Sequence, residues 1–543
     1  MTDDLDALSE ATLPEARPMA ATIARAGLVV SAAYLASRVL GYFRYVIIAT
    51  TFGAGSDLDS FLAAFRIPDF IFQLVAAGAV ASALVPIVSG FIATGQQARA
   101  WRIVATVANL MLLGLVVLAG VAFVFAPLLV PAIAPGFDAS EAARTVDLTR
   151  IMLVGPILLA LGAVATAALN GSRRFAAAAA APSVYNLAII GAAILLAPSL
   201  GVVGLALGVV AGSAGHLFIQ LPALARVGFR YRPRIDLGDG EARHALLLMA
   251  PRALGLGATQ LIFVVLTSLA STQGLGAITA YTIAFSLLQI PIGVIGVPLG
   301  IVLFPSLAGG IASGQRKTYV ALVERGIRIA SFVMLPIAAV GMVLASQVVA
   351  LLLGYGRFDA TAAALTASTL VAFLVGLPAY APIEVLARAF YARQDTVTPV
   401  FGAVLCMIAT VITANLLVGA IGLPALGVGL SLGNWLEMAV LLLALRRREG
   451  TLDLGSIARL AAVAAAGSVL AAAVALGAVH VVGPLLEAGK LRSLLEAVAA
   501  TVGATLTFIV WARLTRLPEL TTLVDLARGL IGRRTGPRVS TPE

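Results

Sequence analysis

The stretch "LMLLGLVVLAGVAFVFAPLLVPAIA", residues 110–134, consists of apolar residues, glycine and proline, without a single charge. An α-helix rises about 1.5 Å per residue, so about 20 apolar residues cross the hydrocarbon core of a bilayer. The stretch is therefore long enough to span a membrane as one helix.

The same pattern recurs along the chain. Of its 543 residues, 60% are hydrophobic and 11% are charged, whereas soluble domains carry about 25% charged residues. These values exclude a large soluble core and predict an all-α polytopic membrane protein. Breaks at Gly, Pro and charge clusters delimit about fourteen transmembrane segments, at residues 27–52, 59–93, 102–133, 145–170, 176–197, 201–224, 243–271, 275–308, 319–354, 361–391, 397–418, 424–445, 457–482 and 492–514.

The basic residues of the loops predict the orientation. Loops after even-numbered segments carry Arg or Lys, as in "RR" at 173–174 and "RRR" at 446–448, whereas "GAGSDLD" and "APSLG" follow odd-numbered segments. Cytoplasmic loops are enriched in Lys and Arg, so both termini are expected in the cytoplasm. The net charge of +10 then reflects topology and does not indicate nucleic-acid binding. The polar first 25 residues predict an uncleaved first helix, and the basic C-terminal tail is expected to be solvated.

A short internal repeat indicates duplication. "LALGVV" at 205–210 resembles "PALGVG" at 424–429, and "LVP" at 84–86 resembles "LFP" at 303–305, both at an offset of 219 (427 − 208 and 305 − 86). Segments 1–6 and 7–12 therefore form two pseudo-symmetric six-helix lobes, an arrangement typical of transporters that work by alternating access. The expected parts are an N-terminal cytoplasmic tail (1–25), an N-lobe (26–225), a basic cytoplasmic linker (226–242), a C-lobe (243–448), a two-helix appendage (449–515) and a basic cytoplasmic tail (516–543).

Two arginines lie inside the first segment. "SRVLGYFRYV", residues 37–46, contains Arg38 and Arg44. An Arg at a helix centre costs about 2.5–3.5 kcal/mol, so it normally faces a cavity or a partner. The alternative is that either side chain extends to the headgroups.

Other polar residues of the segments are candidates for the same site. "FRIPDF" places Arg66 and Asp69 three residues apart, where they can contribute to a cavity or pair with each other, and Arg252 contributes from segment 7. Asp59 is a further candidate, or simply a helix N-terminal acid. Glu384 and Arg388 are expected to form an i,i+4 pair, and Asn415 and Glu437 to hydrogen-bond between helices.

No enzyme chemistry is indicated. The sequence contains no pairing of a nucleophile with a base and no nucleotide-binding loop, its histidines are isolated, and its one cysteine is Cys406. We therefore expect no catalytic residue, no metal site and no cofactor, and a coupling cation stays unassigned. An excess of arginine inside the lobes suits an anionic ligand such as a diphosphate, because guanidinium binds phosphate oxygens bidentately.

The chain resembles the MurJ/MviN family of lipid II flippases, members of the multidrug/oligosaccharidyl-lipid/polysaccharide exporter superfamily. The resemblance rests on "SRVLGYFR", "FGAGSDLDSFLAAFRIPD", "LVPI", "APGF", "GVPLGIVLFPSLA", "GYGRFDA" and "FYARQDTVTPV", in the family's order from about residue 26 to about residue 445. It implies fourteen helices and a cationic central cavity. It also implies transport of undecaprenyl-diphosphate-linked peptidoglycan precursor to the outer leaflet of the bacterial inner membrane, with membrane lipids and cell-wall synthesis proteins as partners. Arg38, Arg44 and Asp59 match residues of the family's first two helices.

The chain departs from the family pattern at four positions. Gln73 stands where a second-helix arginine is usual, Ala77 where an acid is common, Ser286 where helix 8 usually supplies an arginine, and Tyr45 where an acid often follows the second arginine. We expect Arg66 and Arg252 to compensate.

Gln73, Ser286 and Gln289 are expected to be supporting polar groups, together with Asp59 and Asp69. The departures leave two alternatives open: a flippase for another polyprenyl-linked saccharide, and a non-transporting scaffold in cell-wall assembly.

Overall fold

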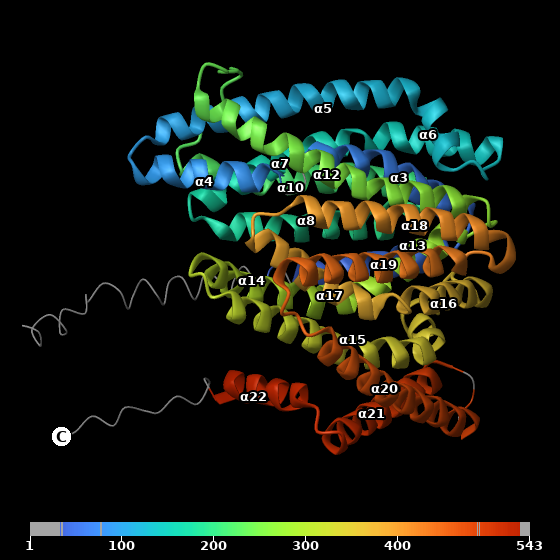
Figure 1. Ribbon diagram of the computed structural model, residues 1–543. Helices are drawn as coiled ribbons and strands as arrows, with labels where there is room; N and C mark the ends of the chain where they lie inside the picture. Colours follow the sequence, from blue (N-terminus) through green and yellow to red (C-terminus); the bar gives the residue numbers. More distant parts are fainter. Residues whose placement is uncertain (1–32, 34–35, 76–78, 486, 488, 533–543) are drawn as a thin grey trace, which may run out of the picture. The chain divides into compact units, whose positions relative to one another are not determined.

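The computed structural model describes residues 33, 36–75, 79–485, 487 and 489–532 (Figure 1). Every regular element in this part of the chain is a helix. The first half contains a helix over residues 36–52, then α3 (Ser56–Val75), α4 (Ala79–Ala93), α5 (Gln97–Ile133), α6 (Ala139–Met152), α7 (Val154–Gly171), α8 (Phe175–Leu195), α9 (Ala197–Leu200), α10 (Val202–Phe218) and α11 (Leu221–Arg226).

The second half is also helical. It contains α12 (Gly240–Ser271), α13 (Ala277–Pro291), the π-helix η1 (Ile292–Gly296), α14 (Val297–Ala312), α15 (Arg316–Leu353), α16 (Ala360–Leu374), α17 (Leu377–Ala392), α18 (Val397–Ile421), α19 (Pro424–Glu449), α20 (Leu454–Val482), the 3₁₀-helix η2 (Gly483–Leu485), α21 (Lys490–Leu514) and α22 (Pro518–Gly532).

The all-α membrane fold predicted from composition is confirmed. Ten helices of the described part are long and apolar enough to cross a membrane, and eleven if α16 and α17, which meet at a bend of 48°, form one span. Two shorter apolar helices cover Val80–Ala93 and Gln260–Ser271. The predicted fourteen segments are compatible with these helices, because several segments are broken into two pieces and the first is described only in part.

Proline and glycine account for breaks in the segments. In segment 8, Pro291 ends α13, one π-helical turn follows, and α14 begins at Val297. A proline lacks the N–H that the preceding turn needs, and π-helical turns are frequent at functional sites. Pro68 differs, because α3 continues through it as one helix.

The chain forms two compact units. Among the described residues, unit 1 comprises those within 33–51, 60–132 and 137–260, and unit 2 those within 52–59, 133–136 and 261–532. Two loop segments from the first half, 52–59 and 133–136, therefore belong to the unit that contains the second half.

Small residues bring neighbouring helices together in the same way in both units. A Cβ on Gly212 of α10 would lie 2.8 Å from the carbonyl oxygen of Tyr185, and one on Gly433 of α19 would lie 2.6 Å from that of Cys406. Both pairs have an offset of 221 (433 − 212 and 406 − 185). Glycines at these positions allow the backbones to approach closely.

Two further glycines show the same offset. Gly201, the N-cap of α10, and Gly422, the C-cap of α18, both have positive φ and also differ by 221, whereas the sequence match gave 219. The duplication stays a prediction, and the contacts of these helices align its two copies two residues differently from the sequence match.

The last helices pack within unit 2. α20 and α21 lie side by side (Figure 1) and form, with α15, a core that contains Phe332, Ala464 and Phe508. The tail beyond Leu514 was expected to be solvated, but part of it forms α22, where the buried Glu519 pairs with Arg328 Nε at 2.7 Å. An amphipathic pattern at 518–532 was the missed signal.

Candidate functional site

Arg44 lies among aromatic rings within unit 1. It belongs to the helix at 36–52 and is half-buried. Its Cζ lies 4.8 Å from the ring centroid of Tyr45 and 5.8 Å from that of Tyr185 in α8. Guanidinium groups within about 6 Å of an aromatic face are stabilised by the ring quadrupole. Tyr45 and Tyr185 therefore help to stabilise this half-buried cation.

Asp69 lies in a polar cluster in the same unit. Its half-buried carboxylate hydrogen-bonds with Gln73 and interacts electrostatically first with Arg66 and then with Arg44. Arg66, Asp69 and Gln73 occupy positions i, i+3 and i+7 of α3, which lie on one helix face. The structure thus brings together four of the predicted residues: Arg44, Arg66, Asp69 and Gln73. We call them the N-terminal polar cluster.

Arg38 lies one and a half turns earlier on the first helix and is half-buried. It interacts with Tyr42 of the same helix. Next to it, the Ser37 carbonyl accepts a hydrogen bond of 3.1 Å from Asn186 Nδ2 of α8. This bond fixes the helix that carries both arginines against α8.

Asp59 has a different environment. It lies in the first turn of α3, ten residues before Asp69, and is 3% exposed. Its carboxylate accepts hydrogen bonds from the backbone N–H of Gly276 at 2.8 Å and of Thr279 at 2.7 Å, and from the Thr279 hydroxyl at 2.6 Å. The position in the first turn agrees with a helix N-terminal acid, but the donors satisfied belong to the start of α13. All of these atoms lie in unit 2.

Close backbone contacts surround this carboxylate. A Cβ on Gly276 (φ +79°) would lie 2.8 Å from the Ala54 carbonyl oxygen, and a Cβ on Gly53 (φ +74°) would lie 2.6 Å from that of Arg357. The N–H of Gly136 donates to the Ser271 hydroxyl at 3.1 Å. The two loop segments of the first half are thus fixed to unit 2 by backbone contacts.

The remaining candidates, Ser286, Gln289 and Arg252, belong to α12 and α13. Ser286 and Gln289 are half-buried in α13, and the Ser286 hydroxyl donates to its own helix at the Thr282 carbonyl, 2.8 Å away. Arg252 lies in α12, but its side chain is outside the described part of the chain, as is Ala77.

Three further polar groups had predicted structural roles, and one of these predictions is wrong. Glu384 and Arg388 form the expected i,i+4 pair, and Glu437 contacts Cys406 of α18 from α19. Asn415 was expected to bond between helices, which is wrong, since its Nδ2 donates to the Val411 carbonyl of its own helix at 2.8 Å. Within the described ranges, no group of three or more His, Cys, Asp and Glu residues could hold a metal ion.

The sequence reasoning did not single out Tyr185 or the fold of the loop after α11. Tyr185 lies in an alanine-rich helix and carries no motif. The loop showed a signal in its alternating arginines, at positions 230, 232 and 234, but was taken only as evidence of orientation.

A multi-pass α-helical membrane protein with broken spans and a cationic cluster inside its helices belongs to the class of membrane transporters. The family model described as "Lipid II flippase MurJ" matches residues 48–495. The chain is 33% identical to the lipid II flippase MurJ of Burkholderia cenocepacia over 432 residues, 78% of this chain and 84% of the relative. It is 31% identical to a probable lipid II flippase MurJ of Rhizobium tropici, over 85% and 88% of the two chains. The chain therefore belongs to the lipid II flippase MurJ family, whose members are transporters rather than enzymes.

Solved structures agree with the fold. "Lipid II flippase MurJ, inward closed conformation" superposes with a TM-score of 0.75 at 20% identity, over 90% of this chain and 99% of that one. An inward-facing multidrug resistance MATE family transporter of the MOP superfamily superposes with a TM-score of 0.63 at 19% identity, over 77% of this chain and 95% of that one. At these identities the likeness concerns the fold alone.

Proposed function

We propose that this protein moves lipid II, the undecaprenyl-diphosphate-linked peptidoglycan precursor, from the cytoplasmic to the outer leaflet of the bacterial inner membrane by alternating access. The observation that carries this proposal is the family membership, and the N-terminal polar cluster agrees with it. The cluster places guanidinium groups inside a membrane-spanning unit, where a diphosphate is the kind of ligand that compensates their charge.

The residues of the cluster have distinct proposed roles. Arg44 binds phosphate oxygens, and the rings of Tyr45 and Tyr185 hold its planar fork ready in one orientation. Arg66 adds a second cation, which Asp69 neutralises when no anion is bound. Because Asp69 also hydrogen-bonds with Gln73, the acid stays positioned when the ligand draws Arg66 away.

Arg38 and Arg252 are proposed to extend this site, with Gln289 as a polar neighbour of the sugar-phosphate headgroup. Both termini are proposed to lie in the cytoplasm, because the loops expected on that side are rich in basic residues. Proteins of cell-wall synthesis are proposed partners.

Another polyprenyl-linked saccharide is a second candidate cargo. The Ser286 hydroxyl already donates a hydrogen bond within its own helix, α13. This helix therefore supplies no substitute for the arginine that is usual at this position in the family. A headgroup that needs fewer cationic contacts would suit this arrangement.

Complementation tests the proposal. The chain is expressed in a bacterium depleted of its own lipid II flippase, together with Arg44→Ala, Arg44→Lys and, as a control, Arg447→Ala at the exposed end of α19. We expect growth with the wild type and with Arg447→Ala, loss of growth with Arg44→Ala, and partial growth with Arg44→Lys, which keeps the charge but not the fork.

The other outcomes are also informative. Growth with Arg44→Ala at normal membrane levels would show that transport does not need Arg44. A wild-type chain that inserts normally and yet fails to support growth would exclude lipid II and favour another lipid-linked saccharide or a scaffold that does not transport.

A further inference from the structure

The loop between α11 and α12 folds against the start of α5 within unit 1. Asn109 of α5 is its main anchor: the side-chain Nδ2 donates to the carbonyl oxygens of Arg232 and Arg234, each at 3.0 Å, and Oδ1 accepts from the Tyr231 hydroxyl at 2.7 Å. Because Asn109 holds the backbone of the two arginines, their side chains are not needed to fix the loop.

Two further contacts fix the end of this loop. Arg99 donates to both carboxylate oxygens of Asp239, at 2.8 and 3.1 Å, and this hydrogen-bonded pair lowers the pKa of Asp239. The N–H of Asp236 donates to the Thr106 hydroxyl at 3.1 Å. The loop is therefore a defined wall, although it contains no helix or strand.

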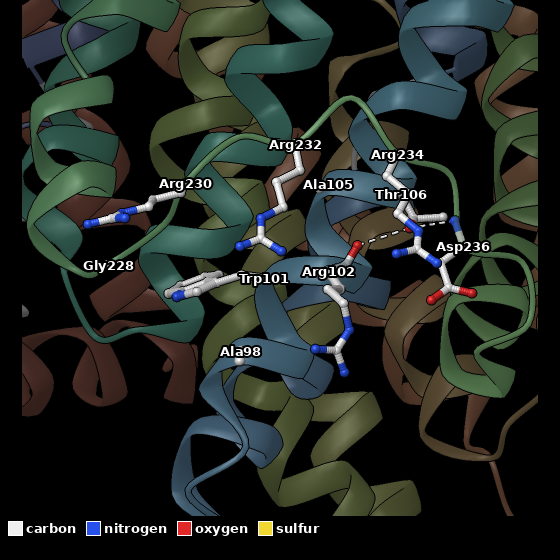
Figure 2. A pocket seen from close by; sticks show the side chains of 10 residues that line it. All are labelled: Ala98, Trp101, Arg102, Ala105, Thr106, Gly228, Arg230, Arg232, Arg234 and Asp236. Carbon is white, nitrogen blue, oxygen red and sulfur yellow. Dashed lines mark hydrogen bonds between the residues drawn. The ribbon is translucent and has the colours of Figure 1, made fainter.

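A pocket of about 190 Å³ lies between the loop and α5 (Figure 2). Four arginine side chains line it, together with a single acid, Asp236; the arginines are Arg102, Arg230, Arg232 and Arg234. In Figure 2 the guanidinium group of Arg232 lies above Trp101, that of Arg230 lies to the left of the ring, and those of Arg102 and Arg234 lie to its right. The volume is several times the roughly 30 Å³ of a water molecule, enough for a phosphate group.

The charge of these arginines is not compensated as it is elsewhere. Arg99 pairs with Asp239, and Arg328, in a second basic pocket between α15 and α20, pairs with Glu519 and donates to the Ser456 hydroxyl. Across the described ranges, no salt bridge joins any of the four pocket arginines to a carboxylate. The pocket therefore has excess positive charge.

Trp101 gives a second, independent indication of a ligand. It is 8% exposed, and its indole Nε1 is buried without a hydrogen-bond partner in the described part of the chain. The ring packs edge-on against Phe229, with centroids 5.7 Å apart, and a Cβ on Gly228 would lie 3.9 Å from Nε1. A buried donor without an acceptor costs about 1–3 kcal/mol, and an anion in the pocket would supply the acceptor.

The pocket lies at the end of a membrane-spanning helix. α5 begins at Gln97, and its large exposed apolar side chains begin at Leu113, about 24 Å further along the axis. The pocket thus precedes the exposed apolar surface of the helix, beside the basic loop. Basic pockets between transmembrane helices bind anionic lipid headgroups where they open at the membrane surface.

We propose that this pocket is an anion site that binds the phosphate group of a ligand, either the headgroup of an anionic phospholipid or a soluble phosphate. The four arginines supply the charge and the Trp101 indole donates to a phosphate oxygen. The site is separate from the N-terminal polar cluster and does not depend on the identity of the cargo.

The test uses the purified full-length protein in a nonionic detergent. Binding is measured by the rise in thermal stability on titration with dihexanoyl phosphatidylglycerol, dihexanoyl phosphatidylcholine or inorganic phosphate. One variant carries Arg230→Gln, Arg232→Gln and Arg234→Gln, and its control carries Arg174→Gln, Arg446→Gln and Arg447→Gln, which removes the same charge from other exposed sites. A third variant, Trp101→Phe, keeps the ring and removes the donor.

For the wild type and the control we expect saturable binding of phosphatidylglycerol, and little binding of phosphatidylcholine. The pocket variant should bind at least tenfold more weakly and Trp101→Phe about fivefold more weakly, with melting temperatures close to wild type in the absence of ligand. Binding of inorganic phosphate with the same dependence on the variants, but not of phosphatidylglycerol, would support the site and identify a soluble ligand. Equal affinity of the pocket variant and the control for every anion would overturn the proposal.

Discussion

Asp59 caps a helix that begins more than two hundred residues later in the chain. Its Oδ1 accepts hydrogen bonds from both the backbone N–H and the hydroxyl of Thr279, and Oδ2 accepts one from the N–H of Gly276. The first N–H groups of a helix lack partners within the helix, and an anion is favoured there by the helix dipole. The carboxylate therefore stabilises the start of α13 and the position of residues 52–59.

Replacing this carboxylate should destabilise the protein. Asp59→Asn removes the charge and one acceptor oxygen, and hydrogen bonds to charged groups contribute about 1.5–3 kcal/mol. We expect a fall of several degrees in the melting temperature of the purified protein in detergent. Asp525→Asn is the control, because Asp525 is exposed on α22, and it should melt near wild type. Equal melting of the two variants would show that the cap is unimportant.

Gly276 should be far less tolerant of alanine than Gly274. Both have positive φ, of +79° and +94°, but a Cβ on Gly276 would lie 2.8 Å from the Ala54 carbonyl oxygen, whereas one on Gly274 would meet no atom within 4 Å. Each alanine adds backbone strain of about 1–2 kcal/mol, and the clash adds to it at Gly276 alone. The measurement is the difference between the melting temperatures of the two variants. A Gly274→Ala variant as unstable as Gly276→Ala would contradict the contact.

Glu449 should be essential for the packing of helix ends in unit 2. It is 2% exposed at the end of α19, where it pairs with Arg316 at 2.6 Å and with Arg393. Removing one partner of a buried ion pair costs about 3–5 kcal/mol, a value that solvent screening of the half-exposed Arg316 reduces. Glu449→Ala should therefore lower the melting temperature and the yield of folded protein.

The comparison for this variant is Asp147→Ala. Asp147 forms an exposed i,i+3 pair with Arg150 at 4.0 Å, and such surface pairs contribute about 0–1 kcal/mol. Its melting temperature should stay within a degree or two of wild type. A larger effect at Asp147 than at Glu449 would reverse the expected order.

Asp395, in the loop between α17 and α18, should make the stability of the folded protein depend on pH in the acidic range. Burial raises its pKa, but hydrogen bonds from the hydroxyl and N–H of Thr398 and from Arg448 lower the pKa to about 2. The usual value is about 3.9. A carboxyl with a lowered folded-state pKa contributes stability that is present above the unfolded-state value and is lost as pH falls through the folded one.

The window is therefore about pH 4 down to about pH 2. We expect the melting temperature of Asp395→Asn to fall less than that of wild type between pH 5 and pH 2.5, with the two proteins differing by at most about 2 kcal/mol at pH 5. Parallel pH profiles of the two proteins would show that Asp395 does not contribute.

The sequence predicted the membrane-spanning helices well because each is a local property of the chain. A run such as 110–134 can only be a buried or lipid-facing helix. Part of the N-terminal polar cluster was also predictable from the sequence, because the spacing of Arg66, Asp69 and Gln73 places them on one helix face. The partner of Asp59 was not predictable, because no local pattern connects position 59 with position 279. The hydrogen bond from the Ser286 hydroxyl to the Thr282 carbonyl was also not predictable, because only the structure of α13 shows it.

By itself, the sequence determined that this protein is a bundle of membrane-crossing helices with arginines inside its first two segments. Hydrophobic transfer and the cost of burying charge act residue by residue, so composition and spacing record them directly. The tertiary structure alone decided which distant groups meet: Asp59 with the start of α13, and the loop arginines with Trp101 and Asn109 around one pocket. Those contacts depend on how helices far apart in the sequence pack against one another. Only this packing sets the hydrogen-bond geometry at the ends of the helices.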